Sequence, residues 1–343
     1  MNYVAVDVGS GLCKFSNSKQ KGFFPSLVGK TKTSEDHFSL GLKDHQQILV
    51  KKDLWLTGTA AQAFLKEDER VIATKQSWSE TDGHIIMIYS VIAYLFPEGF
   101  SGSLNIVSGL PMKKYNAEAK SYKNKLIGNH TFSTPNFNYD VTLEESSTVV
   151  IPQVVGLHFA NMLHNKGNWN ETKIAYVDPG TQTTGWAVMD EGIFQNVLSG
   201  GDNIGLNKLA KEIRTYLKER YDYETTDNTQ ILKALRKGSI DIRSNGKKET
   251  VCLEEIANQF VPKGYGKLID KIYEHWSGAK DMDIIVSSGG GRYLISALKR
   301  KFSACSLLHA PSKTNKKKTE NEEAIFDVVE GYAVYAENML GES

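Results

Sequence analysis

The chain has 343 residues, of which 40% are hydrophobic and 24% charged, a composition typical of soluble proteins with enough apolar material for two domains. The 41 lysines and arginines against 40 aspartates and glutamates leave a net charge of +1, which argues against extensive direct nucleic-acid binding. Three scattered cysteines favour a reducing, cytoplasmic location, and the most apolar stretch, residues 85–96, is too short to span a membrane.

The first predicted element is a buried strand at residues 3–6 that runs into the turn Asp7-Val8-Gly9-Ser10-Gly11 and a second strand near Lys14. A carboxylate at a strand end can hold hydrated Mg²⁺ beside phosphates. Gly9 and Gly11 let backbone N–H groups approach phosphate oxygens, Ser10 adds a donor, and Lys14 supplies a positive charge. An isolated hairpin of this kind is usually an ordinary turn.

Several predicted strands and helices separate the first hairpin from a second one. Residues 30–80 are polar and mixed, 82–95 predict an amphipathic helix, and 104–111 a buried strand ended by Gly and Pro. A strand at 148–151 precedes a helix at 153–163. The strand 173–177 then enters a turn with the same combination of a carboxylate, a glycine and small donors, formed by Asp178, Gly180, Thr181, Gln182, Thr183 and Thr184. The repetition predicts two related halves.

The last third of the sequence adds a third strand that ends in glycines. A long helix is predicted over 203–220, with Lys208, Lys211 and Glu212 on one face. The strand 283–286 leads into Gly289, Gly290 and Gly291, which would let the backbone lie flat against an adenine or its ribose, while Arg292 would stack on the base. The basic run Lys313–Lys318 is interpreted as a solvated loop, with a filament or adaptor contact as the alternative. Since there is no GxxxxGK[ST] loop, opposed hairpins are expected to hold the phosphates.

The order of these motifs resembles the superfamily of actin, sugar kinases and heat-shock chaperone ATPases. Finer features are similar to its prokaryotic branch, the ParM/StbA plasmid-segregation proteins and archaeal actin-like relatives. They are Phe24-Pro25-Ser26, the segment 107–111, the segment 199–205 and Ile240-Asp241-Ile242. The resemblance runs nearly end to end.

The resemblance implies roles for individual residues. Gln153 would orient the attacking water, with Glu144 or Glu145 as the alternative. Asp7 and Asp178 would act in catalysis and hold Mg²⁺ through water, and Lys211 and Glu212 would lie beside the ribose and base. Family members often have Asp where Gly185 stands, and Pro179 replaces a small residue; the first difference removes a carboxylate from the predicted site.

The expected architecture is an α/β, two-domain, actin-like (ribonuclease H-like) fold with a nucleotide cleft between the domains. Domain I would span residues 1–160, with an inserted subdomain at about 30–80. Domain II would span 161–343, with an insertion at about 206–280, and the C-terminal helix 321–340 would pack back on domain I. That helix contains Gly331, a helix-interior glycine.

The predicted function is that of a polymerising ATPase, with ATP or GTP and Mg²⁺ as cofactors. Its partners would be further copies of itself in a filament and a DNA-binding adaptor through which the filament segregates or positions DNA. Three alternatives remain: a small-molecule (sugar or acid) kinase of the same fold, a chaperone-like ATPase, and a scaffold that binds ATP without hydrolysing it. The chain has little length left for a peptide-binding domain after its last helix, and no substrate-facing base of a kinase stands out.

Overall fold

A computed structural model describes residues 2–31, 42–72, 78–164, 172–225, 228–244, 247–309 and 323–339. The run Lys313–Lys318 lies outside these ranges, as do residues 32–41 and 73–77 of the predicted 30–80 subdomain. Within them, no helix combines the length and the apolar character needed to cross a membrane.

The chain forms two compact units, each described here by itself. Unit 1 comprises Met1–Leu110, Lys114–Phe159 and Val329–Ser343, and unit 2 comprises Pro111–Lys113 and Ala160–Val328. The chain therefore passes from one unit to the other near residues 110–114, 159–160 and 328–329.

The described strands, in chain order, are β1 (Tyr3–Val8), β2 (Leu12–Ser16), β3 (Lys21–Pro25), β4 (Leu27–Thr31), β5 (Gln47–Val50), β6 (Asp53–Thr57), β7 (Val71–Ile72), β8 (Phe100–Ser103), β9 (Asn105–Leu110), β10 (Gly128–Ser133), β11 (Asn138–Leu143), β12 (Thr148–Pro152), β13 (Lys173–Pro179), β14 (Thr184–Asp190), β15 (Ile193–Phe194), β16 (Gly200–Asp202), β17 (Ser239–Ser244), β18 (Lys247–Cys252), β19 (Asp283–Val286) and β20 (Cys305–Leu307). The described α-helices are α1 (Gly58–Phe64), α2 (Asp82–Leu95), α3 (Met112–Leu126), α4 (Gly156–His164), α5 (Leu206–Tyr221), α6 (Asn228–Lys237), α7 (Leu253–His275), α8 (Ser288–Lys299) and α10 (Asp327–Met339). Short 3₁₀ turns include η4 (Gln153–Val155) and η6 (Ala324–Phe326).

The first sheet of unit 1 has the order β12-β9-β1-β2-β3 in the described residues. β12, β9 and β1 run parallel, whereas β2 and β3 continue the sheet as antiparallel hairpins. All six residues of β1 are buried, as expected for an apolar strand in a sheet covered on both faces. Since parallel strands end at one edge, the turn after β1 and the segment after β12 emerge there together.

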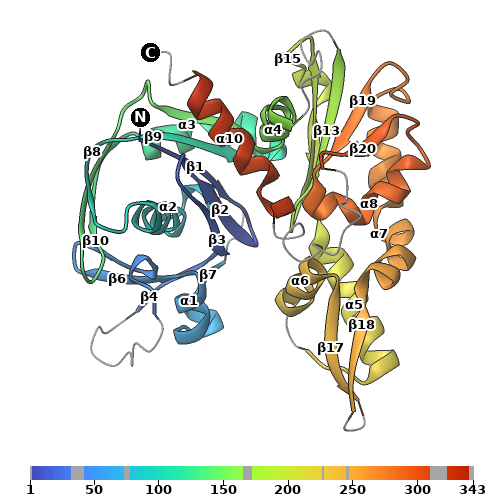
Figure 1. Cartoon of the computed structure of the whole chain (residues 1–343), viewed down its shortest axis with the longest axis horizontal. Helices are drawn as coiled ribbons and strands as arrows, with labels where there is room; N and C mark the ends of the chain where they lie inside the picture. The colour runs from blue at the N-terminus through green and yellow to red at the C-terminus, as the bar shows by residue number, and fades with distance from the viewer. Residues whose placement is uncertain are drawn as a thin grey trace. The chain divides into compact units, whose positions relative to one another are not determined.

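A second sheet of unit 1 has the order β7-β4-β6-β5-β10-β11-β8 in the described part of the chain. It differs from the predicted subdomain at 30–80, because β8, β10 and β11 come from residues 100–143 and join the earlier strands through the pairing of Leu49 with Ser133. Figure 1 shows this sheet curving around α2, which also contacts β1 and β2. Nearly every α2 residue is buried, so the helix is enclosed rather than amphipathic as predicted.

The C-terminal helix α10 packs within unit 1 along the part that begins at Val329. Tyr332 is fully buried there, and a Cβ on Gly109 would lie 1.9 Å from its hydroxyl oxygen, so only glycine fits at this point of β9. The Tyr3 hydroxyl donates to Glu337 Oε1 at 2.7 Å, and Lys21 Nζ lies 2.8 Å from Glu330 Oε1.

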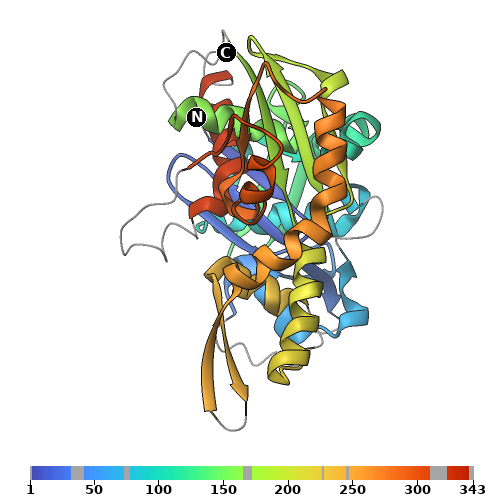
Figure 2. The ribbon, with the colours of Figure 1, turned by 90° about the vertical axis from the view of Figure 1, so that its right-hand side faces the viewer.

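Unit 2 repeats the topology of the first sheet of unit 1. Its main sheet has the order β15-β14-β13-β19-β20, and β16 adds to β14, counting described residues only. β13, β19 and β20 are parallel, and β14 is the antiparallel partner of β13, as β2 is of β1. Helices α5 to α8 build the core beside this sheet. Figures 1 and 2 show the β17–β18 hairpin projecting from that helical part.

Candidate functional site

Asp7 is the centre of a polar group in unit 1. It is fully buried near the end of β1, where its cross-strand neighbour on β2 is Lys14. Lys14 Nζ forms an ion pair with Asp7 Oδ2, and Gln153 Nε2 donates to Asp7 Oδ1. Two residues predicted from separate motifs thus meet the same carboxylate, which is how a buried charge is compensated in a protein interior.

The two candidates for orienting water lie at opposite ends of β12. Gln153 follows the strand, at the edge where β1 ends with Asp7. Glu144 and Glu145 are exposed in the turn before the strand. Five strand residues cover roughly 17 Å, so both glutamates lie at the end of β12 away from Asp7, whereas Gln153 contacts it. Which residue orients the water stays a prediction.

The turn after Asp7 is tight and partly exposed. A Cβ on Gly9 would lie 2.9 Å from the carbonyl oxygen of Leu12, so the turn closes too tightly for a larger residue. Ser10 and Gly11 are also partly exposed, and the carbonyl of Gly11 accepts the backbone N–H of Ser26 at 3.2 Å. The turn is therefore held in place by the residue that follows β3, and it stays partly accessible to solvent.

The second hairpin, in unit 2, is held from outside by the segment that starts α5. The N–H groups of Leu206 and Asn207 donate to the carbonyls of Gly180 and Thr181 at 2.9 and 2.8 Å. A Cβ on Gly205 would lie 2.5 Å from the carbonyl carbon of Gln182. Gly205 belongs to the segment 199–205, which the sequence marks as a feature of the resemblance but does not link to the second hairpin.

The polar residues of the second hairpin divide into two groups. Asp178, Thr181, Gln182 and Thr183 are partly exposed at the tip. Thr184 is fully buried, and its hydroxyl donates to the carbonyl of Ile204 at 2.6 Å. In this structure the Thr184 hydroxyl therefore secures the loop before α5, and its donation to phosphate stays a prediction.

The three glycines after β19 form the first turn of α8 rather than an open turn. A Cβ on Gly290 would lie 2.0 Å from the carbonyl oxygen of Pro179, and one on Gly291 would lie 2.4 Å from Val286 Cγ1. These two positions are glycine because the helix packs directly on β13 and β19. Their predicted contact with a base is thus not needed to explain the residue type. The backbone N–H groups of a helix start still favour an anion.

Arg292 is held by a neighbouring helix. Its Nη2 donates to the carbonyls of Leu235 and Arg236 at the end of α6, the latter at 3.2 Å, and to the hydroxyl of Tyr293 at 2.9 Å. These carbonyls carry the negative end of the helix dipole. The guanidinium therefore joins α8 to α6, a role that the sequence reading missed. Lys211 and Glu212 are exposed side by side on α5, and their contact with a ribose or base stays a prediction.

The carboxylates fit Mg²⁺ that is bound through water. Gln153 donates to Asp7 Oδ1, and the buried Oδ2, ion-paired with Lys14, accepts no hydrogen bond from the described residues, although a carboxylate oxygen has two acceptor positions. Asp178 is at the equivalent place in the second hairpin, and its cross-strand neighbour is Gly185. The aspartate that the resemblance leads us to expect at position 185 is therefore absent. Oxygen donors with intervening waters are the surroundings that Mg²⁺ prefers.

Comparison with known proteins gives one family match and several similar folds. A family described as "Actin like proteins N terminal domain" matches residues 5–156. The fold is similar to that of Ta0583, an archaeal actin homolog (TM-score 0.78, 17% identity, 99% of this chain and 100% of that chain). It is also similar to a ParM from a 15-stranded filament of Clostridium botulinum (TM-score 0.72, 20% identity, 98% and 99%).

A ParM of Bacillus thuringiensis, solved with AMPPNP, is similar as well (TM-score 0.67, 16% identity, 100% of both chains). No curated protein matches the sequence. Residues 5–156 thus match a family of actin-like N-terminal domains, and the chain has a two-domain α/β fold similar to that of an archaeal actin homolog and of ParM proteins.

Proposed function

We propose that the chain is a nucleotide-dependent, polymerising actin-like ATPase whose filaments segregate or position DNA through a DNA-binding adaptor. The observation that carries the proposal is the duplicated hairpin: the two units repeat one sheet topology, and each places an aspartate, Asp7 or Asp178, before a glycine turn. A single turn of this kind is usually an ordinary turn. Two on equivalent strands suit the two-sided binding of a phosphate chain.

The chain offers several groups that suit phosphate binding. Backbone N–H groups around Gly9 and Gly180 and the hydroxyls of Ser10, Thr181 and Thr183 are the donors, and the start of α8 adds further N–H groups. Mg²⁺ bound through Asp7 and Asp178 would neutralise phosphate charge. ATP is the expected nucleotide, with GTP as the alternative, and solved ADP and AMPPNP complexes of similar folds support a nucleotide of this size.

Gln153 is the proposed water-positioning residue. Its amide is too weak a base to remove a proton, but a phosphoryl transfer requires chiefly that the water be aligned with the bond that breaks. Donation to Asp7 Oδ1 fixes the amide nitrogen and leaves the amide oxygen to accept from a water.

Filament formation and DNA positioning are supported by the fold and by charge. One similar structure is a ParM filament and another is a non-polymerisable ParM mutant. A head-to-tail contact between copies does not close on itself and therefore gives filaments. The net charge of +1 suits an adaptor that contacts DNA on behalf of the filament.

The test is sedimentation and light scattering of the purified chain with ATP and Mg²⁺, together with the release of phosphate. We expect assembly above a threshold concentration and phosphate release that follows it. Phosphate transfer that requires an added sugar or acid, without assembly, would establish the kinase alternative. ATP binding with neither assembly nor turnover would establish the scaffold alternative.

A further inference from the structure

Asp327, at the start of α10, is a buried carboxylate to which the proposed function gives no role. It is 2% exposed, and its Oδ2 accepts the backbone N–H of Ser288 at 2.5 Å. Ser288 is the first residue of α8, whose opening N–H groups have no partner within the helix. The carboxylate thus satisfies one of these donors and places a negative charge at the positive end of the helix dipole.

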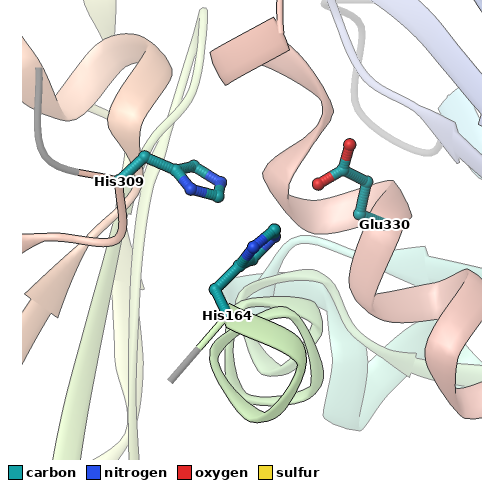
Figure 3. A group of neighbouring side chains, drawn as sticks. All are labelled: His164, His309 and Glu330. Atoms are coloured by element: carbon teal, nitrogen blue, oxygen red, sulfur yellow. The ribbon is translucent and has the colours of Figure 1, made fainter. Parts of the chain in front are cut away.

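A second segment meets Asp327 at the same point. Asp327 Oδ1 lies 3.3 Å from His309 Nε2, and the backbone N–H of His309 donates to Ser288 Oγ at 2.8 Å. Figure 3 shows the His309 ring beside that of His164, with 4.2 Å between their centroids. The start of α8 is therefore tied to the chain that follows β20 and to the start of α10.

The glycine turn of α8 is enclosed by protein on two sides. A Cβ on Gly289 would lie 3.0 Å from the carbonyl oxygen of Ala324 in η6, just before Asp327. On the other side, Gly290 packs on the carbonyl of Pro179, next to Asp178. The position of the turn relative to the second hairpin therefore depends on the segment 324–327.

We propose that Asp327 is a positioning residue for nucleotide binding. It holds the glycine turn of α8 at the place beside Pro179 from which the turn's N–H groups bind the nucleotide. Any movement of this turn on nucleotide binding also reaches α10 through Asp327, immediately before the chain enters unit 1 at Val329. The inference rests on the proposed nucleotide binding and adds a residue that does not itself contact the ligand.

The experiment measures the affinity of the full chain for fluorescent (N-methylanthraniloyl) ATP in the parent and in three variants. Asp327→Asn keeps an acceptor for Ser288 but removes the charge, and we expect affinity to fall about tenfold, the effect of one charge-assisted hydrogen bond. Asp283→Asn removes the same charge from the other, exposed end of β19 and leaves affinity unchanged. Leu298→Ala creates a cavity at the far end of α8 and lowers stability.

Melting curves without nucleotide separate positioning from general destabilisation. Positioning predicts that Asp327→Asn loses more affinity than Leu298→Ala for an equal or smaller drop in melting temperature, with turnover at saturating ATP unchanged. Equal affinity of Asp327→Asn and the parent, or losses that follow melting temperature alone, would overturn the inference. A parent chain that binds no nucleotide would instead refute the proposed function itself.

Discussion

Gln153 and Asp7 illustrate how much depends on single contacts near the first hairpin. We expect Gln153→Ala to slow phosphate release by about tenfold to a hundredfold while ATP affinity is nearly unchanged, because only the alignment of water is lost. Single-turnover phosphate release together with equilibrium binding measures the two effects separately. Glu144→Ala, at the opposite end of β12, is the control and should release phosphate at the parental rate.

The Lys14–Asp7 pair should stabilise the fold more than an exposed pair does. The side chains are 18% and 1% exposed, so Lys14→Met leaves a buried carboxylate without its cation and should cost about 3 kcal/mol. Urea denaturation measures the loss. The matched control is Lys30→Met, whose pair with Asp53 is more than half exposed and should change stability by about 1 kcal/mol or less. Equal losses for both variants would show that Asp7 does not need Lys14.

His84 makes the stability of unit 1 sensitive to acid. Burial, and then the charges of Lys125 and Lys114, lower its pKa from 6.5 to about 3. The unfolded chain therefore takes up a proton between these values and the folded chain does not, so the free energy of unfolding decreases as pH falls from 6.5 towards 3. His84 alone should account for about 2 kcal/mol of the loss at pH 5.

The measurement is urea denaturation at several pH values. His84→Gln keeps a hydrogen-bonding side chain opposite the Tyr122 hydroxyl, which lies 2.9 Å from His84 Nε2, and removes the titration. The variant should therefore show a smaller decrease in stability between pH 6.5 and 4. An unchanged pH dependence would assign the effect to other groups, since burial also lowers the pKa values of His45 and His158 to about 4.

At the scale of elements, replacing a helical glycine by alanine tests whether the helix is closely packed at that position. Gly290→Ala at the start of α8 would place a Cβ 2.0 Å from a carbonyl oxygen, and it should destabilise unit 2 by about 2 kcal/mol or more. Gly264→Ala, in the middle of α7 with open space around it, should stabilise by about 1 kcal/mol. Thermal denaturation compares the two, and a stabilising Gly290→Ala would contradict the packing of α8 on Pro179.

The elements that sequence patterns predict well are those with local signals. The apolar runs and glycine turns of β1 and β13 predict both hairpins, the apolar run 283–286 predicts β19, and the order of these motifs underlies the resemblance from which the fold is expected. The helical period of residues 82–95 gave α2 but not its full enclosure, because the surrounding strands come from distant segments. Asp327 carries no local signal, since a carboxylate before an apolar helix looks like any helix start. The contacts of Arg292 with the last carbonyls of α6 carry no local signal either, because tertiary packing sets them, and its stacking on a base stays a prediction.

At the scale of the whole molecule, a nucleotide that binds the folded chain and not the unfolded chain increases the free energy of unfolding. At a concentration about 100 times its Kd, ATP with Mg²⁺ should add about 2.7 kcal/mol to the folded state. Calorimetry should then show a higher melting temperature with ATP or ADP, and none of this rise with a sugar alone. A rise with the sugar and none with nucleotide would contradict the ATPase proposal.

The second sheet of unit 1 also has a consequence for how the chain is made. Its two halves, β4 to β7 on one side and β8, β10 and β11 on the other, are separated in the sequence by α2 and join where Leu49 meets Ser133. During synthesis, one edge of β5 therefore stays unpaired until β10 and β11 have left the ribosome. Contacts between such distant segments form slowly, and an open strand edge accepts a strand from another molecule. The interval between these two halves is thus the period in which a newly made chain is most exposed to aggregation.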